Sequence, residues 1–378
     1  MIGPGKALGV LGGGHLGRML AQAAQALGYR VHVYEPSGPS PAGSVADRET
    51  HAPYEDVAAL DAFARSVDVV TCEFEDIPDE ALEAVEAAAA LHPSAGVLRT
   101  CQRRWREKAW IRAGGFPHAR FAEALDGDIG AAAGRLGLPC VVKAADFGCD
   151  GQGQMRVATA GELAQAEAIF RGRRSILEEW VDLECEISVI CARSGPGATR
   201  TFPVSENIHS NGILDLSVVP ARIPPQVEAA ARKLAAGIAE SLGVVGLLSV
   251  EMFLTRPGGI LVNGLAPRPH DSGLWSVDVG ETSQFEQHVR AVCGLPLGPS
   301  GARSPVVTAT ILGEAWTRRG GAVVAEPDWA AVLSEPRAKL HLYGRPVARP
   351  GRRMGHFTVR GGDVEETLSL ARELRARL

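Results

Sequence analysis

Residue types that bind metals and anions are gathered in residues 249–273, which read SVEMFLTRPGGILVNGLAPRPHDSG. Two strand-like runs, SVEMFL and GILVNGL, are joined by RPGG, a sequence typical of a turn, and together they predict a β-hairpin. The hairpin brings Glu251 near Asn263, and three polar side chains follow on an irregular segment: Arg268, His270 and Asp271. One carboxylate and one amide on strands are more often surface groups than a metal site, so the hairpin alone leaves both interpretations open.

A lysine and a glycine-rich loop form a second group, in PCVVKAADFGCDGQGQMRV. This stretch predicts a strand that carries Lys143, then a loop with Gly148, Gly151 and Gly153, then another strand. Glycines allow backbone N–H groups to fold over a polyphosphate, and the lysine ammonium supplies a point charge to its oxygens. An ordinary glycine-rich hairpin has a similar sequence, so the loop by itself is only moderately specific.

Three acidic residues follow this loop, Glu178 and Glu179 in ILEEWV and then Glu186. Adenine needs partners for its amino group, and ribose needs an acceptor for its hydroxyls. Each acid alone is interpreted as a solvated charge. The order of lysine, glycine loop, acid pair, acid and carboxylate-bearing hairpin favours a nucleotide site instead.

The N-terminal segment GVLGGGHLGRM contains Gly12, Gly14 and Gly17 in the G-x-G-x-x-G spacing, between a predicted strand and helix, and Glu35 ends the next predicted strand. This is the dinucleotide fingerprint, in which the glycines approach a pyrophosphate and the acid binds a ribose hydroxyl. The same turn also serves any phosphate at a helix N-terminus, or simple helix–sheet packing. A nicotinamide oxidoreductase is therefore one hypothesis among several.

The elements that carry these groups alternate along the chain. Short β-branched runs and Ala-rich helical runs alternate over the first hundred residues, which predicts βαβ units and a parallel sheet. A basic helix is predicted from Arg103 to Ala113, and a helix with strong 3.6-residue periodicity precedes the hairpin. The last seventy residues, after the Pro/Gly/Ser-rich LPLGPSGARSP, predict a small α/β unit closed by a helix. We place domain boundaries near residues 100 and 302.

Composition limits the class of protein. The 378 residues are 46% hydrophobic with a net charge of −5, which predicts a soluble globular protein without a global basic field for nucleic acid. The seven cysteines are scattered without a C-x-x-C spacing, and we interpret them as reduced, hence cytoplasmic. No targeting segment or membrane span is evident.

Motifs along essentially the whole chain resemble one family. The order of the nucleotide-binding groups resembles the ATP-grasp enzymes, and the detail resembles N5-carboxyaminoimidazole ribonucleotide synthetase. The motifs that carry this resemblance are GVLGGGHLGRML, SPAGSVADRE, VVTCEFEDIP, REKAWIRAGGFP, CDGQGQ, VSENIHSNGIL, APRPHDSG, TSQFEQHVRAVCGLPLG and YGRPVARPGRRMGHFTV.

The resemblance implies an α/β fold in three parts. Residues 1–100 would form an N-terminal Rossmann-like (pre-ATP-grasp) domain, and 101–302 an ATP-grasp domain with two subdomains around the nucleotide cleft. Residues 303–378 would form a small C-terminal α/β domain. The implied enzyme is a cytoplasmic, homodimeric ligase of purine biosynthesis. Bicarbonate attacks the γ-phosphate of ATP to give carboxyphosphate, and the amine of aminoimidazole ribonucleotide captures the carboxyl group or released CO2.

The resemblance also assigns roles to residues, with ATP and Mg²⁺ as the implied cofactors. Lys108 and Lys143 would reach the phosphates, Glu178 and the backbone near Trp180 and Val181 the adenine, and Glu186 the ribose. The other implied cofactor-binding residues are Gly151, Gly153, Gln154, Glu179 and Asn263. Glu251 would hold the metal.

The ribonucleotide and bicarbonate would be bound at the other end. Arg268, His270, Arg345, Arg349 and Arg352 would gather bicarbonate and phosphate oxygens, because guanidinium groups grip oxyanions bidentately. The implied catalytic residues are Arg268, His270, Asp150, Arg345 and Arg352. The implied substrate-binding residues are Gly14, His15, Leu16, Glu75, Ser272 and Arg349. The alternative for the C-terminal arginines is a solvated or nucleic-acid-binding patch.

Several positions depart from the family pattern. The second metal carboxylate of the family directly follows the asparagine of the hairpin, and here that position is Gly264. The glycine loop has Cys149 and Gln152 where the family has tyrosine and a basic residue, and the family's asparagine after histidine is Asp271. Arg345 stands for a lysine, and Gln102-Arg103-Arg104 for glutamine-aspartate-arginine.

These departures keep two further hypotheses open. One is a diverged ATP-grasp ligase that joins another carboxylate to an amine. The other is a nucleotide-binding protein with little or no catalysis. Gln152 removes a positive charge near the polyphosphate and Asp271 adds a negative one near the bicarbonate, and both changes are expected to oppose anion binding.

Overall fold

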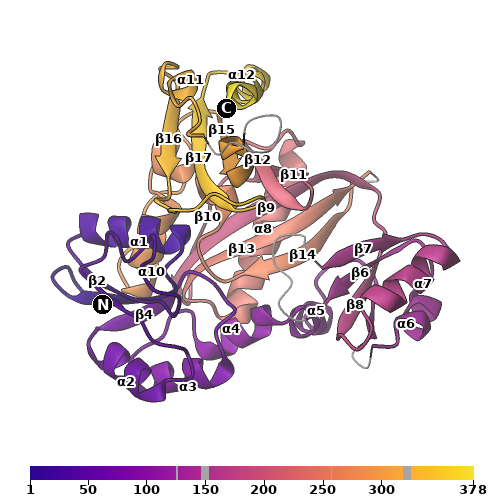
Figure 1. Ribbon diagram of the computed structural model, residues 1–378, viewed down its shortest axis with the longest axis horizontal. Helices are drawn as coiled ribbons and strands as arrows, with labels where there is room; N and C mark the ends of the chain where they lie inside the picture. Colours follow the sequence, from indigo (N-terminus) through magenta and orange to yellow (C-terminus); the bar gives the residue numbers. More distant parts are fainter. Residues whose placement is uncertain (125–126, 146–152, 257, 318–324) are drawn as a thin grey trace.

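The computed structural model of the protein describes residues 1–124, 127–145, 153–256, 258–317 and 325–378. Within these residues the strands form three sheets, two with four strands and one with nine. Figure 1 shows a sheet near the N-terminus, a small separate sheet at the opposite end, and the large sheet between them with the C-terminal strands at one side. The α/β fold expected from the alternating sequence pattern is confirmed.

The N-terminal sheet is parallel, with the strand order β3-β2-β1-β4. Its strands are β1 (Ala7–Leu11), β2 (Arg30–Tyr34), β3 (Arg48–Thr50) and β4 (Val69–Cys72). Its helices are α1 (His15–Ala26), α2 (Val57–Arg65), α3 (Asp79–Ala88) and α4 (Ala95–Gln102). Alternate side chains of β1 reach opposite faces, because Leu8 and Val10 join the core beside α1, whereas Leu11 joins the core beside α2 and α3.

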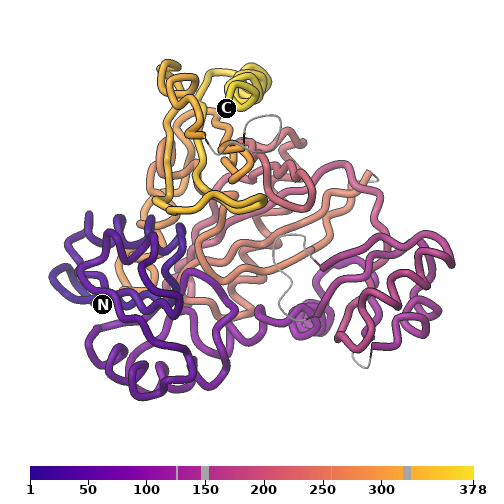
Figure 2. Tube along the Cα trace, viewed as in Figure 1, coloured from indigo at the N-terminus to yellow at the C-terminus, as the bar shows by residue number. Residues whose placement is uncertain are grey.

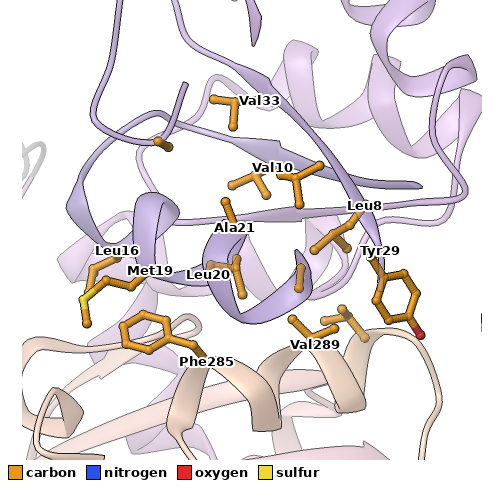
Figure 3. Packing of buried hydrophobic residues seen from close by; sticks show 14 of the residues in the cluster. Leu8, Val10, Leu16, Met19, Leu20, Ala21, Tyr29, Val33, Phe285 and Val289 are labelled. Atoms are coloured by element: carbon orange, nitrogen blue, oxygen red, sulfur yellow. The ribbon is translucent and has the colours of Figure 1, made fainter. Parts of the chain in front are cut away.

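Helix α1 connects the N-terminal sheet to the rest of the molecule. Figure 3 shows Leu16 and Leu20 of α1 against Phe285 and Val289 of α10 (Gln284–Val292), and Leu8 of β1 belongs to the same cluster. All of these side chains are buried. Each contributes roughly 1.5–3 kcal/mol on burial, so this contact fixes the loop between β1 and α1 relative to the large sheet.

The small sheet has the order β5-β8-β6-β7, with every pair antiparallel. Its elements are β5 (Phe121–Ala124), α6 (Ile129–Leu136), β6 (Cys140–Ala144), β7 (Gln154–Val157), α7 (Ala160–Ile169) and β8 (Ser175–Glu179). The α6 and α7 helices cover one face. Side chains fix both helix starts, because Asp128 accepts from Ala131 N–H, and Thr159 and Glu162 form a capping box. The other face is left for the cleft.

The large sheet has the order β14-β13-β9-β11-β12-β15-β17-β16, and β10 pairs with β9. The strands from the middle of the chain are β9 (Leu183–Gly195), β10 (Ala198–Thr201), β11 (Ser205–Ser210), β12 (Ile213–Val219), β13 (Gly246–Thr255) and β14 (Ile260–Ala266). The predicted hairpin is confirmed as β13 and β14, which pair in antiparallel fashion with an irregularity after Glu251.

Helices cover the large sheet where apolar stripes face it. The predicted periodic helix is α8 (Pro225–Leu242), which ends at Gly243 in the left-handed conformation, with φ of 71°. The predicted basic helix is α5 (Arg104–Ala113), and α9 (Ser276–Val279) follows the 3₁₀ turn Asp271–Gly273. In the described residues, no helix is long and apolar enough to cross a membrane.

The C-terminal strands and helix form as predicted, but they extend the large sheet. The elements are β15 (Val306–Leu312), a 3₁₀ turn (Gly313–Trp316), α11 (Ala330–Leu333), β16 (Ala338–Leu342), β17 (Arg353–Arg360) and α12 (Val364–Arg377). Strand β15 pairs with β12, so the hydrogen bonding of the sheet continues across residue 302. The boundaries near 100 and 302 therefore stay predictions.

Candidate active site

A cavity of about 590 Å³ lies between the small sheet and the large sheet. Figures 1 and 2 show the two sheets side by side, with α5 at their junction. From the small sheet the lining includes Lys143, Gln154 and Glu178, and from the large sheet it includes Glu186 and Glu251. The cavity thus brings together the lysine, the acids and the hairpin carboxylate that the sequence placed in order.

Two lysines enclose one carboxylate at the end of the cavity formed by β6 and β8. The Nζ atoms of Lys108 and Lys143 lie 3.1 Å from different oxygens of Glu178. Burial by itself raises the pKa of Glu178. Lys143 and Lys108 outweigh that effect and lower the pKa of Glu178 below its ordinary value. Burial lowers the pKa of Lys143 to about 8, against the opposing effect of Glu178. This end therefore holds cationic groups close together, which suits a polyphosphate.

The segment after β8 forms one wall of the cavity. Trp180 and Val181 line it, and the Trp180 ring is stacked by the guanidinium of Arg156 at 4.6 Å. Glu179 also lines the cavity and binds Arg120 through both the backbone N–H and Nε, each at 2.7 Å. A flat ring beside a strand edge is a suitable wall for a purine base.

Glu186 of β9 lies farther along the wall and pairs with a histidine. The distance from Glu186 Oε2 to His209 Nδ1 is 3.3 Å. Burial raises the pKa of Glu186, and His209 opposes that effect. This carboxylate can accept hydrogen bonds from hydroxyls, the chemistry expected of it.

The hairpin places Glu251 opposite Gly264 and adjacent to Asn263 in the cavity wall. Glu251 Oε1 lies 3.3 Å from His270 Nε2. Burial raises the pKa of Glu251, but His270 outweighs that effect and lowers this pKa to about 2. Asn263 Oδ1 lies 3.5 Å from Lys143 Nζ. The side of the cavity that carries Gly264 thus faces the lysine end.

Glu107 of α5 also lines the cavity beside Gly264. It was not selected as a site residue, although it lies within REKAWIRAGGFP, a motif that carried the family resemblance. Its Oε1 accepts the N–H of Leu265 at 2.5 Å, and its side chain is buried. Burial raises the pKa of Glu107 to about 7, against Arg104 and Lys108.

The oxygen ligands suit Mg²⁺, which binds one or two carboxylates together with nucleotide phosphates. Glu251 is the carboxylate that the sequence selected for it. In the part of the chain that the structure describes, no group of three or more His, Cys, Asp and Glu residues is arranged to hold a metal ion by itself. A cation here would therefore depend on phosphate oxygens as well.

Beyond the hairpin, an arginine and a carboxylate face each other in the wall. Arg268 Nε donates to Glu75 Oε2 at 2.5 Å, and Nη2 donates to Glu75 Oε1 at 3.3 Å. His270 lines the cavity as expected, and its Nδ1 lies 2.9 Å from Ser272 Oγ. Ser272 is buried and lies outside the lining, where it contacts the His270 ring and Ser188 Oγ.

Asp271 is held by residues from both ends of the chain. Its Oδ1 lies 2.8 Å from His15 Nε2, and its Oδ2 lies 3.1 Å from Arg353 Nε. His15 stacks on Tyr343 with ring centroids 4.4 Å apart. Burial raises the pKa of Asp271, but Arg353 and His15 outweigh that effect and hold this pKa well below its ordinary value. The charge that Asp271 adds is thus compensated locally, which the sequence did not indicate.

The glycine turn of the N-terminal sheet donates its N–H groups to the protein's own carboxylates. Gly14 N–H and Gly17 N–H donate to the two oxygens of Glu73, the latter at 2.6 Å. Gly13 N–H donates to Glu35 Oε2 at 2.8 Å. Burial raises the pKa of Glu73, and the Gly17 N–H opposes it. Since these carboxylates occupy the turn, its geometry does not favour a dinucleotide pyrophosphate.

Of the expected substrate and catalytic residues that the structure describes, seven lie outside the cavity lining: Gly14, His15, Leu16, Ser272, Arg345, Arg349 and Arg352. Leu16 is buried in the core beside α10. Arg349 is exposed, and Arg352 Nη1 donates to Val347 O at 3.0 Å. Arg345 is half-buried; burial and nearby Arg352 lower its pKa, and in the described structure its buried Nε makes no hydrogen bond.

The glycine loop is only partly described. Asp150, Gly151 and the departures Cys149 and Gln152 lie outside the described residues. Gly153 begins the described chain beyond the loop with φ of 82°, and its carbonyl accepts Ala144 N–H at 2.9 Å.

Four basic residues of the cavity lining were not selected from the sequence as site residues: Arg104, Arg156, His209 and Arg353. His209 and Arg353 lie within motifs that carried the family resemblance, VSENIHSNGIL and YGRPVARPGRRMGHFTV, so each had a detectable signal. Arg156 had none, because its stacking on Trp180 joins β7 to the segment after β8.

Comparison with known proteins covers the whole chain. Residues 5–102 match the ribonucleotide synthetase preATP-grasp domain, 110–285 the ATP-grasp domain, and 309–369 the phosphoribosylaminoimidazole carboxylase C-terminal domain. The N5-carboxyaminoimidazole ribonucleotide synthase of Bacillus subtilis is 42% identical over 359 residues, which cover 95% of this chain and 92% of that protein.

Solved structures agree in fold. The ADP complex of an N5-carboxyaminoimidazole ribonucleotide synthetase is 40% identical with a TM-score of 0.92, covering 99% of this chain and 97% of the other. The Aspergillus clavatus enzyme in complex with ADP and 5-aminoimidazole ribonucleotide is 29% identical with a TM-score of 0.88, covering 98% of each chain. The chain therefore belongs to the N5-carboxyaminoimidazole ribonucleotide synthase family of ATP-grasp enzymes.

Proposed function

We propose that this chain is an ATP-dependent ligase that carboxylates 5-aminoimidazole ribonucleotide with bicarbonate and forms N5-carboxyaminoimidazole ribonucleotide in purine biosynthesis. One observation carries the proposal. A single cavity contains Lys143 and Glu178 at one end and Glu75, Arg268 and Asp271 at the other. A nucleotide and a second anionic substrate can therefore meet inside it.

ATP would occupy the end with the two lysines. Lys108 and Lys143 would turn from Glu178 toward the phosphates, while the segment at Trp180 and Val181 holds the adenine and Glu186 accepts from the ribose. Relatives of known structure bind ADP, which supports the nucleotide part of the proposal.

Mg²⁺ would be held by Glu251 together with phosphate oxygens, and when bound it supplies positive charge that offsets the charge developing on the γ-phosphoryl group. Glu251 is suited to this role because His270 favours its ionised form.

Bicarbonate would bind near Arg268 and His270. One of its oxygens bonds to the γ-phosphorus as the bond to ADP breaks, which gives carboxyphosphate. The amine nitrogen of the ribonucleotide would then bond to the carboxyl carbon, phosphate would leave with its electron pair, and the proton lost from the nitrogen would be taken up by the departing phosphate. Arg268 would stabilise the oxyanions, and Glu75 would accept a hydrogen bond from the amine. Because the acyl phosphate hydrolyses in water, the site would have to exclude solvent during turnover.

The test is ADP release by the purified protein with Mg²⁺, ATP and isotopically labelled bicarbonate, with and without aminoimidazole ribonucleotide. We expect strong stimulation by the ribonucleotide and label in the carboxylated product. ADP release that ignores the ribonucleotide would favour a ligase for another amine. ATP binding without ADP release would favour a binding protein.

The remaining expectations stay proposals. A homodimer and a cytoplasmic location follow from the resemblance. The six cysteines in the described residues are all free, which supports a reducing compartment. Sedimentation analysis of the purified chain tests the dimer.

A further inference from the structure

The place of the missing metal carboxylate is bordered by two carboxylates from different parts of the chain. A Cβ added to Gly264 would lie 3.2 Å from Glu251 Oε2 and 3.7 Å from Glu107 Oε1, and no other described atom beyond the neighbouring residues would lie within 4 Å of it. Glu251 comes from β13 and Glu107 from α5. A side chain at residue 264 would therefore begin between these two groups.

Glu107 is fixed with its carboxylate at this place. Its Oε1 accepts the N–H of Leu265, the residue after Gly264, at 2.5 Å. The side chain is buried and lines the cavity. Within the described structure this is its one hydrogen bond, and a carboxylate has two oxygens with about four acceptor sites, so a single backbone donor leaves capacity for a cation.

The other carboxylate that could replace the missing one is Asp271, but both its oxygens are engaged. Oδ1 pairs with His15 and Oδ2 pairs with Arg353. Recruiting Asp271 to a metal would take this carboxylate from the buried His15 and the half-buried Arg353, which is costly. The geometry therefore favours Glu107.

We propose that Glu107 supplies the second carboxylate of the nucleotide-bound Mg²⁺ site, in place of the side chain that Gly264 lacks. Two carboxylates plus phosphate oxygens are an ordinary ligand set for Mg²⁺. The site would then be assembled from α5 and β13, instead of from the two strands of one hairpin. This inference rests on the proposed function for the identity of the cation, but it concerns metal binding alone.

The test measures Mn²⁺ binding to the ADP complex by electron paramagnetic resonance, without ribonucleotide or bicarbonate. Glu107→Gln keeps an oxygen for Leu265 N–H and removes the charge. We expect Mn²⁺ to bind at least about tenfold more weakly, with unchanged affinity for metal-free ADP and an unchanged thermal midpoint. The matched control is Glu123→Gln. The Glu123 carboxylate on β5 lies outside the cavity lining and pairs with Arg112 of α5, the helix that also carries Glu107. Mn²⁺ binding should not change in this variant.

Moving the carboxylate provides a second test. In Glu107→Gln/Gly264→Glu the Mn²⁺ affinity should return to within about threefold of the parent. Unchanged Mn²⁺ affinity in a folded Glu107→Gln protein would overturn the proposal. If that variant does not fold, Gly264→Glu alone decides: a gain of tenfold or more would show that the parent lacks a second carboxylate and would overturn it, whereas a change below threefold supports it. Failure of the carboxylation assay would not affect these readings.

Discussion

Asp271 and Gly264 lie at the same cavity and depart from the family pattern in opposite directions. Asp271 adds a carboxylate, and His15 and Arg353 enclose it. Gly264 removes a carboxylate, and the groups beside it are two further carboxylates, Glu107 and Glu251. Both oxygens of Asp271 are paired with basic side chains, whereas Glu251 has one histidine partner and Glu107 one backbone donor, so carboxylate oxygens remain for a cation beside Gly264. Two changes that look equally damaging in the sequence therefore have different consequences.

The strongest test of the Gly264 side is Glu251→Ala. If Glu251 anchors the cation beside Gly264, ADP release should fall by at least about 100-fold, because charge on the transferring phosphoryl group is no longer offset. The measurement is steady-state ADP formation at saturating ATP and Mg²⁺. Activity equal to that of the parent would show that Glu251 does not hold the metal, and it would remove the basis for contrasting Gly264 with Asp271.

Removal of the Asp271 carboxylate should lower the stability of the protein. Asp271→Ala removes the carboxylate that pairs with the buried His15 and the half-buried Arg353, so we expect the free energy of unfolding to fall by about 3 kcal/mol. Urea denaturation measures it. The control is Asp61→Ala, which removes an exposed pair with Arg65 and should cause no measurable change. An equally small effect at Asp271 would mean that its two pairs do not compensate for burial.

The charge of Lys143, at the end of the cavity near Gly264, should make ATP affinity depend on pH. Lys143 has a folded-state pKa of about 8, below its ordinary value, so the free protein loses this positive charge as pH rises through 8. ATP favours the charged form, and its affinity should therefore fall above pH 8, by at most about tenfold per pH unit. Calorimetric titration between pH 7 and 9.5 measures the fall.

Lys143→Arg provides the control, because arginine stays charged across this range. Its ATP affinity should be nearly independent of pH, whatever its absolute value. A parent affinity that is equally flat would show that Lys143 is not the group that titrates. The same shift has a consequence for stability: a lysine with a lowered pKa destabilises the folded state below pH 8, and this cost is relieved as pH rises toward 10.5.

Local sequence pattern predicted the elements, but not the contacts between distant segments. The hairpin with Glu251, the strand with Lys143 and the helix α5 follow from periodicity and turn chemistry. The pairing of His15 with Asp271 joins residues 256 positions apart, and no local pattern encodes it. The same holds for Glu73, which occupies the glycine turn, and for β15, which extends the large sheet. Long-range pairs depend on tertiary packing, and they are the part that decides how each departure is tolerated.

The smallest expected effect is that of Gly264→Glu on turnover. If Gly264 were an uncompensated loss, the added carboxylate would lower the Mg²⁺ concentration needed for half-maximal ADP release substantially. With Glu107 and Glu251 already beside that position, we expect a decrease of less than about threefold. The control is Gly134→Glu on α6, where the added side chain meets open space and changes the net charge equally. If Gly264→Glu greatly lowers the required Mg²⁺ concentration and Gly134→Glu does not, the metal site beside Gly264 lacks a ligand in the parent. The change at Asp271 would then be compensated by the protein, and the change at Gly264 would not.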